Sequence, residues 1–86
     1  MPNQDLFNQI EEYRSFAAGQ TIFREGEPGD NLYIVTEGEV DILMNDELIL
    51  ETVGSGGIVG ELALVDDKPR SATAIARTDC VLAPVS

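Results

Sequence analysis

The sequence predicts a mainly β protein: an antiparallel β-roll with a short N-terminal helix and one further helical turn inside the β region. Three observations predict this fold class. The chain has 86 residues, which is enough for one small domain. Its hydrophobic fraction of 43%, rich in Val, Ile and Leu, indicates a folded chain. From Arg14 onward, β-rich runs alternate with turn residues every eight to twelve residues or so, a spacing typical of a sandwich or barrel.

The first element is predicted to be an amphipathic helix over residues 3–13. Asn3 can cap its start, and Glu11 and Glu12 are expected to face solvent. The apolar side chains that recur at helical spacing are Leu6, Phe7, Ile10 and Tyr13.

Residues 14–86 are predicted to form the β-roll. Seven runs carry the strand pattern: residues 15–17, 20–25, 31–38, 39–44, 47–53, 71–77 and 80–85. The expected turns are residues 18–19, 25–30, Gly38, 45–46 and 54–57. In one run, Val40, Ile42 and Met44 alternate with Asp41 and Leu43, as in a half-buried strand. In another, Ala72, Ala74 and Ala76 share one face and Thr73, Ile75 and Arg77 the other, so something is expected to pack closely on the alanines.

One segment inside the β region resists the strand pattern. Residues 61–65, ELALV, follow a glycine-rich turn and are good helix formers, so a single helical turn starting at Gly60–Glu61 is expected. Backbone N–H groups without partners at such a start can bind an anion, and Gly60 lets it approach closely. Arg70 supplies a planar fork suited to phosphate, and Ser71 and Ala72 add donors.

Glu61 constrains the ligand, because a carboxylate beside a phosphate repels it. An ionised Glu only accepts hydrogen bonds, so the conflict disappears if the ligand carries a hydroxyl next to its phosphate. A ribose with its phosphate joined at the 3′ oxygen has such a group, the 2′-hydroxyl. Glu61 and Arg70, nine residues apart, therefore fit a ribose cyclic phosphate better than free phosphate. The alternative is an exposed ion pair between these two side chains.

Residues 60–73, GELALVDDKPRSAT, closely resemble the phosphate-binding cassette of cyclic nucleotide-binding domains. This family includes catabolite-activator-type regulators, cyclic-nucleotide-gated channels and regulatory subunits of cyclic-AMP-dependent protein kinase. Residues 16–43, FAAGQTIFREGEPGDNLYIVTEGEVDIL, resemble the first strands of the family, with Gly29 and Gly38 in typical places. The resemblance spans residues 16–85 and implies a jelly-roll type β-roll flanked by helices.

The resemblance also implies a role for each cassette residue. Gly60 and Ala63 would donate backbone N–H groups to the phosphate, and Arg70 would pair with it. Ser71 and Ala72 would complete the phosphate contacts. Glu61 would bind the ribose 2′-hydroxyl, with the Leu62 backbone at the same turn. Family members with Ala or Ser after the cassette arginine tend to bind cyclic AMP and those with Thr cyclic GMP, so Ser71 favours cyclic AMP.

Composition excludes several other classes. Sixteen acidic against five basic residues, a net charge of −11, argue against binding of nucleic acid or an anionic membrane by this segment. The chain has neither an apolar run of membrane-spanning length nor a signal peptide pattern. It has no His, which argues against a metal site, a cupin enzyme and catalysis in general. The one cysteine, Cys80, indicates a reducing compartment, and a cytoplasmic location is expected.

The prediction is therefore one cyclic nucleotide-binding domain over residues 1–86, a regulatory sensor with no cofactor beyond its ligand. Members of the family normally continue into two further helices, the second of which covers the base. The chain stops at Ser86, where these should begin. Either the chain is a fragment of a longer protein, or the lid is supplied by another chain. The missing helices are expected to connect the domain to an effector domain or a second copy. The alternative is a degenerate β-roll that binds nothing and serves as a protein-interaction or oligomerisation module.

Overall fold

The computed structural model describes residues 12–29, 31–45, 47–64 and 68–85, and most of these lie in strands. The strands are β1 (Arg14–Phe16), β2 (Thr21–Phe23), β3 (Leu32–Glu37), β4 (Val40–Met44), β5 (Leu48–Val53), β6 (Ile58–Val59), β7 (Thr73–Ala76) and β8 (Cys80–Val85). A 3-10 turn, η2 (Glu61–Leu64), follows β6. Each of the seven predicted runs overlaps a strand, so the prediction of a mainly β chain is confirmed.

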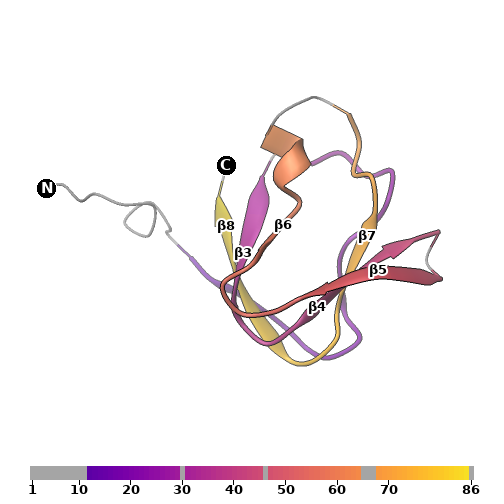
Figure 1. Cartoon of the computed structure of the whole chain (residues 1–86). Helices are drawn as coiled ribbons and strands as arrows, with labels where there is room; N and C mark the ends of the chain where they lie inside the picture. The colour runs from indigo at the N-terminus through magenta and orange to yellow at the C-terminus, as the bar shows by residue number, and fades with distance from the viewer. Residues whose placement is uncertain (1–11, 30, 46, 65–67, 86) are drawn as a thin grey trace, which may run out of the picture.

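The strands form two four-stranded sheets, in the orders β1-β8-β3-β6 and β2-β7-β4-β5. Every pairing is antiparallel, as predicted. Neighbours in a sheet are mostly distant in the sequence, so the chain passes back and forth between the two layers, as Figure 1 shows. Each crossing brings residues of distant segments together, and the candidate site depends on this.

The core lies between the two sheets. Its largest completely buried apolar side chains are Leu82, Val35 and Val40, at 0% exposure. Each such side chain contributes about 1.5–3 kcal/mol on burial. Ala74 and Ala76 on β7 belong to the same cluster. The expectation that something packs closely against this alanine face is therefore confirmed.

Thr73, on the face of β7 opposite the alanines, is completely buried, and its Oγ1 accepts a hydrogen bond from the Glu25 N–H at 2.9 Å. One detail of the predicted strand faces is wrong. In β4, Leu43 is buried and Met44 is 40% exposed, the reverse of the expected alternation. The pairing of β4 with β5 shifts register between Ile42 and Leu43, and such irregularities bend and twist a strand pair.

The short strand β6 was not predicted. Ile58 and Val59 follow the glycine-rich segment 54–57, which forms the expected turn with Gly57 N donating to Gly54 O at 3.0 Å. They pair with Tyr33 and Ile34 of β3 at the sheet edge.

The predicted helix over residues 3–13 lies almost wholly outside the described residues. Its last two positions, Glu12 and Tyr13, are exposed and not helical. The turn expected from Gly60–Glu61 is four residues of 3-10 helix, η2, packed against β3. Among the described residues, no helix is long and apolar enough to cross a membrane.

Candidate functional site

The candidate site is a cleft of about 330 Å³ bordered by the predicted cassette, residues 60–73. Pockets that bind small molecules begin at about this size. Gly60 directly follows β6, η2 comes next, and residues 68–72 lead into β7. Gly60 has φ +77°, a conformation that favours glycine, and a Cβ there would lie 2.6 Å from Nη1 of Arg70. The turn into the cassette therefore requires a residue that has no side chain.

The main chain of Arg70 is docked onto the turn over residues 25–30. The Arg70 N–H donates to the Glu27 carbonyl at 2.8 Å, and the Gly26 N–H donates to the Arg70 carbonyl at 2.9 Å. These two bonds join segments more than forty residues apart in the sequence. They fix the point from which the arginine side chain enters the cleft.

The guanidinium of Arg70 is held between neutral groups. Nη1 donates to the Gly60 carbonyl at 3.3 Å, and Nη2 donates to Oδ1 of Asn31 at 3.1 Å. Its Cζ lies 4.1 Å from the centroid of the Phe23 ring. Nε is buried and has no hydrogen-bond partner among the described residues. It faces Gly29, where a Cβ would lie only 2.2 Å away, so the arginine occupies the space that a side chain would need.

Among the residues that the structure describes, none provides a counter-ion for Arg70. Arg70 is 8% exposed, and it forms no ion pair with a carboxylate of the described residues. The pairs that are present there join Arg77 to Glu39 and Asp41 at the surface. The alternative of an exposed ion pair between Arg70 and Glu61 is thus wrong. A buried charge without a partner costs several kcal/mol or more, so this position suits a bound anion.

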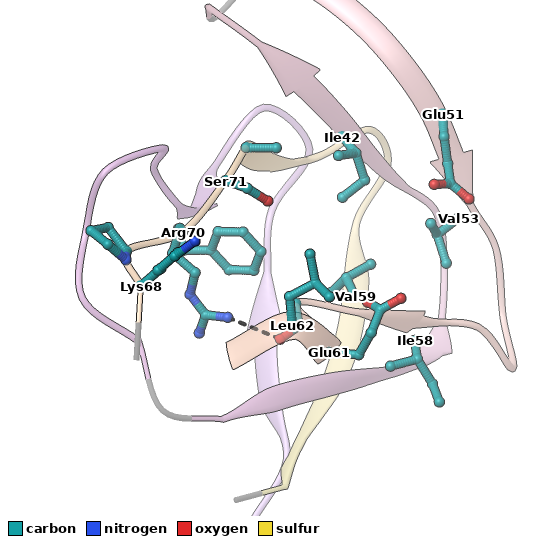
Figure 2. Close-up of a pocket in the computed structure, with 14 residues that line it drawn as sticks. Ile42, Glu51, Val53, Ile58, Val59, Glu61, Leu62, Lys68, Arg70 and Ser71 are labelled. Carbon is teal, nitrogen blue, oxygen red and sulfur yellow. Dashed lines mark hydrogen bonds between the residues drawn. The ribbon is translucent and has the colours of Figure 1, made fainter. Parts of the chain in front are cut away.

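The side of the cleft opposite Arg70 carries aliphatic side chains together with the carboxylates of Glu51 and Glu61. Figure 2 shows Arg70 and Ser71 at one side, with aliphatic side chains facing them across the opening. These aliphatic residues are Ile42, Val53, Ile58, Val59 and Leu62. Ile58 and Leu62 are 46% and 59% exposed, so the apolar side remains open to solvent. The arrangement can hold a ligand with an anionic end and a flat or apolar end.

The structure brings most of the predicted site residues together. Those lining the cleft are Gly60, Glu61, Leu62, Arg70, Ser71 and Ala72. Ala63 belongs to the same turn, η2. Glu61 is exposed and lines the cleft without contacting the guanidinium at ion-pair distance. Because η2 has only four residues, the anion-binding capacity here depends on Arg70 and individual N–H groups rather than a helix dipole.

Three residues at the site were not singled out as functional from the sequence. Phe23, Gly29 and Asn31 each touch or border the guanidinium of Arg70. Gly29 was noted only as part of the expected turn over residues 25–30 and as a position of the family resemblance, with no contact to Arg70 predicted. The Asn31 contact spans 39 positions, and no local pattern reports contacts at that separation.

Cys80 lies outside the cleft, at the start of β8, and is 3% exposed. Burial, with a smaller contribution from the neighbouring Asp79 carboxylate, raises the pKa of its thiol above the ordinary value of 9.0. A protonated, buried thiol is a poor nucleophile. Cys80 is thus a small buried strand residue.

A two-sheet β-roll whose cleft contains a buried arginine with hydrogen bonds to neutral described groups suits an anionic ligand. The comparisons with known proteins identify the module. The family model for the cyclic nucleotide-binding domain matches residues 13–86. This chain belongs to the cyclic nucleotide-binding domain family, and the resemblance predicted from the cassette is confirmed.

Individual relatives agree with this assignment. A cAMP-dependent protein kinase regulatory subunit from Eremothecium gossypii is 46% identical over 77 residues, which is 90% of this chain and 16% of that protein. The chain thus spans about a sixth of that relative's length. A structure of cAMP-bound PfPKA-R is 32% identical with a TM-score of 0.81, covering 87% of this chain and 26% of that one. A structure from work on a cyclic-GMP-dependent signalling pathway that regulates bacterial phytopathogenesis is 34% identical with a TM-score of 0.83, covering 100% and 72%.

Proposed function

We propose that this domain binds 3′,5′-cyclic AMP in the described cleft and acts as a regulatory sensor with no catalytic chemistry of its own. The observation that carries the proposal is the buried guanidinium of Arg70, which has hydrogen bonds only to neutral described groups. A cyclic phosphodiester supplies one negative charge, which compensates the buried guanidinium. Each charge-assisted hydrogen bond to it contributes about 1.5–3 kcal/mol.

Glu61 is proposed to read the sugar. It lines the same cleft as Arg70 but forms no ion pair with it, so its carboxylate oxygens can accept a hydrogen bond from a ligand. A phosphate joined at the 3′ oxygen of ribose has the 2′-hydroxyl as its nearest donor. The backbone at Gly60, Leu62 and Ala63, with Ser71 and Ala72, is proposed to complete the ribose phosphate contacts.

The base is proposed to occupy the apolar side of the cleft. Ile42, Val53 and Leu62 offer aliphatic surface to a purine face there. Named relatives include proteins linked to either cyclic AMP or cyclic GMP. The choice of cyclic AMP rests on Ser71, which lines the cleft next to Arg70.

Binding is proposed to act by population shift between two arrangements of the cassette and whatever contacts it. The partner that reads this shift would be an effector segment or a second chain. The single cysteine is consistent with a reducing compartment, so we place the sensor in the cytoplasm. The exposed Leu48, Ile49 and Leu50 of β5, at 49–60% exposure, favour the rival idea of a ligand-free interaction module.

Calorimetric titration with cyclic AMP, cyclic GMP and 5′-AMP tests the proposal. We expect cyclic AMP to bind most tightly. At 100 times the dissociation constant it should add about 2.7 kcal/mol of stability, a melting shift on the order of 10 °C or more. Absence of binding and of any shift at millimolar ligand would leave the interaction module as the better explanation.

Two arginine variants test the phosphate assignment. Arg70→Leu should weaken cyclic AMP binding from about tenfold to several hundredfold or more, since it removes one or two charge-assisted bonds. Arg77→Leu is the matched control, because it removes the same charge from an exposed site paired with Glu39 and Asp41. Equal affinities of the Arg70→Leu variant and the wild type would contradict the assignment.

Two glutamate variants test the sugar assignment. Glu61→Gln should weaken cyclic AMP more than 2′-deoxy cyclic AMP, because only the former presents the 2′-hydroxyl. Glu51→Gln removes a charge elsewhere on the same cleft and should change both affinities by similar, smaller factors. If Glu61→Gln reduced both affinities equally, the Glu61 carboxylate would act through its electrostatic field and not through a hydrogen bond with the 2′-hydroxyl.

A further inference from the structure

The ring of Phe23 lies against the guanidinium of Arg70, with Cζ 4.1 Å from the ring centroid. We propose that Phe23 is a positioning residue: its ring holds the Arg70 guanidinium in the orientation that receives the phosphate. This inference rests on the proposed function and extends it to a residue outside the cassette. It assigns to β2 a role in affinity that does not require contact with the ligand.

The contacts of the Arg70 guanidinium are of two kinds, those at the edges of the planar group and one on its face. The hydrogen bonds to Gly60 O and Asn31 Oδ1 leave from the edges of the planar group. The Phe23 ring instead covers a face, within the range of a cation–π contact. Edge contacts alone permit the plane to tilt about the line that joins them. Contact with the ring restricts this tilt.

The Phe23 ring is itself fixed in position. Phe23 is 8% exposed and belongs to the core cluster between the sheets. Its ring is stacked on that of Tyr33, with centroids 6.3 Å apart and planes inclined by 20°. The two rings come from different sheets, β2 and β3, so the packing of the sheets sets the position of the ring.

Phe23 also borders the place where the cassette begins. A Cβ on Gly60 would lie 3.3 Å from Cε2 of Phe23 as well as 2.6 Å from Nη1 of Arg70. Phe23, Gly60 and Arg70 therefore meet at one point, and all three line the cleft. The ring excludes water from one face of the guanidinium while the cleft remains open beside it.

The expected benefit is preorganisation. Arginine is among the side chains with the most rotamer freedom, and a ligand that must order it binds more weakly. A guanidinium is also weakly hydrated and stacks readily on an aromatic face, which an ammonium does less well. The arrangement thus prepares a planar, charged group before the ligand arrives.

A double-mutant cycle tests the inference. Phe23→Leu should weaken cyclic AMP binding by about tenfold in the wild-type background. In the Arg70→Lys background, which keeps the charge without the planar group, the same substitution should change affinity by less than about twofold. Phe23→Tyr, which keeps the ring, should restore nearly full affinity. Val40→Ala is the control for general loosening of the core, because Val40 belongs to the cluster but does not line the cleft.

Nuclear magnetic resonance supplies a readout that needs no stable variant at position 23. Protons over an aromatic face are shielded, so the Arg70 side-chain N–H signals should lie upfield of those of exposed Arg24 and Arg77. Assignment follows from their loss in Arg70→Lys, and Phe23→Leu, where it folds, should abolish the shift. Unshifted signals would overturn the inference.

The outcomes separate the two proposals. If the wild type bound no cyclic nucleotide, the proposed function would fail, and this inference with it. If the wild type bound cyclic AMP and Phe23→Leu weakened binding equally in both arginine backgrounds, or not at all, the positioning role alone would fail.

Discussion

Gly29→Ala is the sharpest test of the idea that Arg70 binds the phosphate of cyclic AMP only when its guanidinium is correctly placed. A Cβ on Gly29 would lie 2.2 Å from Nε and 2.4 Å from Cζ of Arg70. Gly29 does not have a positive φ, so alanine introduces no backbone strain there. Gly54→Ala is the matched control, since Gly54 also lacks a positive φ and a Cβ there meets nothing within 4 Å.

The size of the effect follows from the contact distances. Ordinary van der Waals contact begins at 3.4 Å, so the guanidinium must move by about 1.2 Å to clear the methyl group. Its hydrogen bonds to Gly60 and Asn31 are already 3.3 and 3.1 Å long, and a shift of this size strains both. We expect about 1–2 kcal/mol lower stability, because part of the charge regains water. The loss of one charge-assisted bond to the ligand predicts affinity about 10- to 150-fold weaker.

Calorimetric titration with cyclic AMP and thermal melts of the wild type, Gly29→Ala and Gly54→Ala measure these quantities. Gly54→Ala should bind like the wild type, and Gly29→Ala should fold but bind weakly. A folded Gly29→Ala protein with wild-type affinity would show that displacing the Arg70 guanidinium does not matter, and would refute the phosphate role.

Three other predictions follow from positions in the structure. Gly60→Ala and Gly56→Ala, at φ +77° and +92°, should each lose about 1–3 kcal/mol of stability, as melts will show. Only Gly60→Ala should also weaken cyclic AMP binding in titration, because only its Cβ approaches Arg70. The Cys80 thiol should react with a disulfide reagent at pH 8 at least about 100-fold more slowly in the folded than in the denatured protein. Because the folded pKa of Cys80 is raised, its contribution to stability should be complete below pH 9.0 and fall as pH rises above it, as denaturant titrations can test; a flat profile would contradict this.

Much of the fold is predictable because its signals are local. Alternating β-rich runs and turn residues identify seven strands without reference to any contact. The eighth, β6, has two residues, Ile58 and Val59, and two residues carry no periodicity. It exists because Tyr33 and Ile34 pair with it, and that pairing is invisible in local sequence.

The burial of Thr73 could not be predicted, for a related reason. Its Oγ1 accepts a hydrogen bond from the Glu25 N–H, which belongs to the turn over residues 25–30. The hydrophobic pattern can assign apolar residues to the faces of a strand. The burial of a polar residue depends instead on whether a donor from a distant segment reaches it.

The site divides in the same way. The cassette is contiguous, so the roles of Glu61 and Arg70 follow from chemistry and resemblance to a family motif. Phe23, Gly29 and Asn31 reach Arg70 only after β2 and the loops around it fold over the start of β7. A sequence pattern identifies the group that binds the ligand more readily than it identifies the groups that hold it in place.

If the proposed function holds, the placement of Arg70 links stability to ligand binding. The guanidinium is buried, donates two hydrogen bonds to neutral described groups and lies against the Phe23 ring, while Nε has no hydrogen-bond partner among the described residues. These contacts are weaker than an ion pair, so they hold the side chain in place without neutralising it. In the proposed complex, the cyclic phosphate supplies a negative charge that the described neighbours of Arg70 do not. The burial of this guanidinium, which costs free energy without a counter-charge, would then favour the binding of an anion.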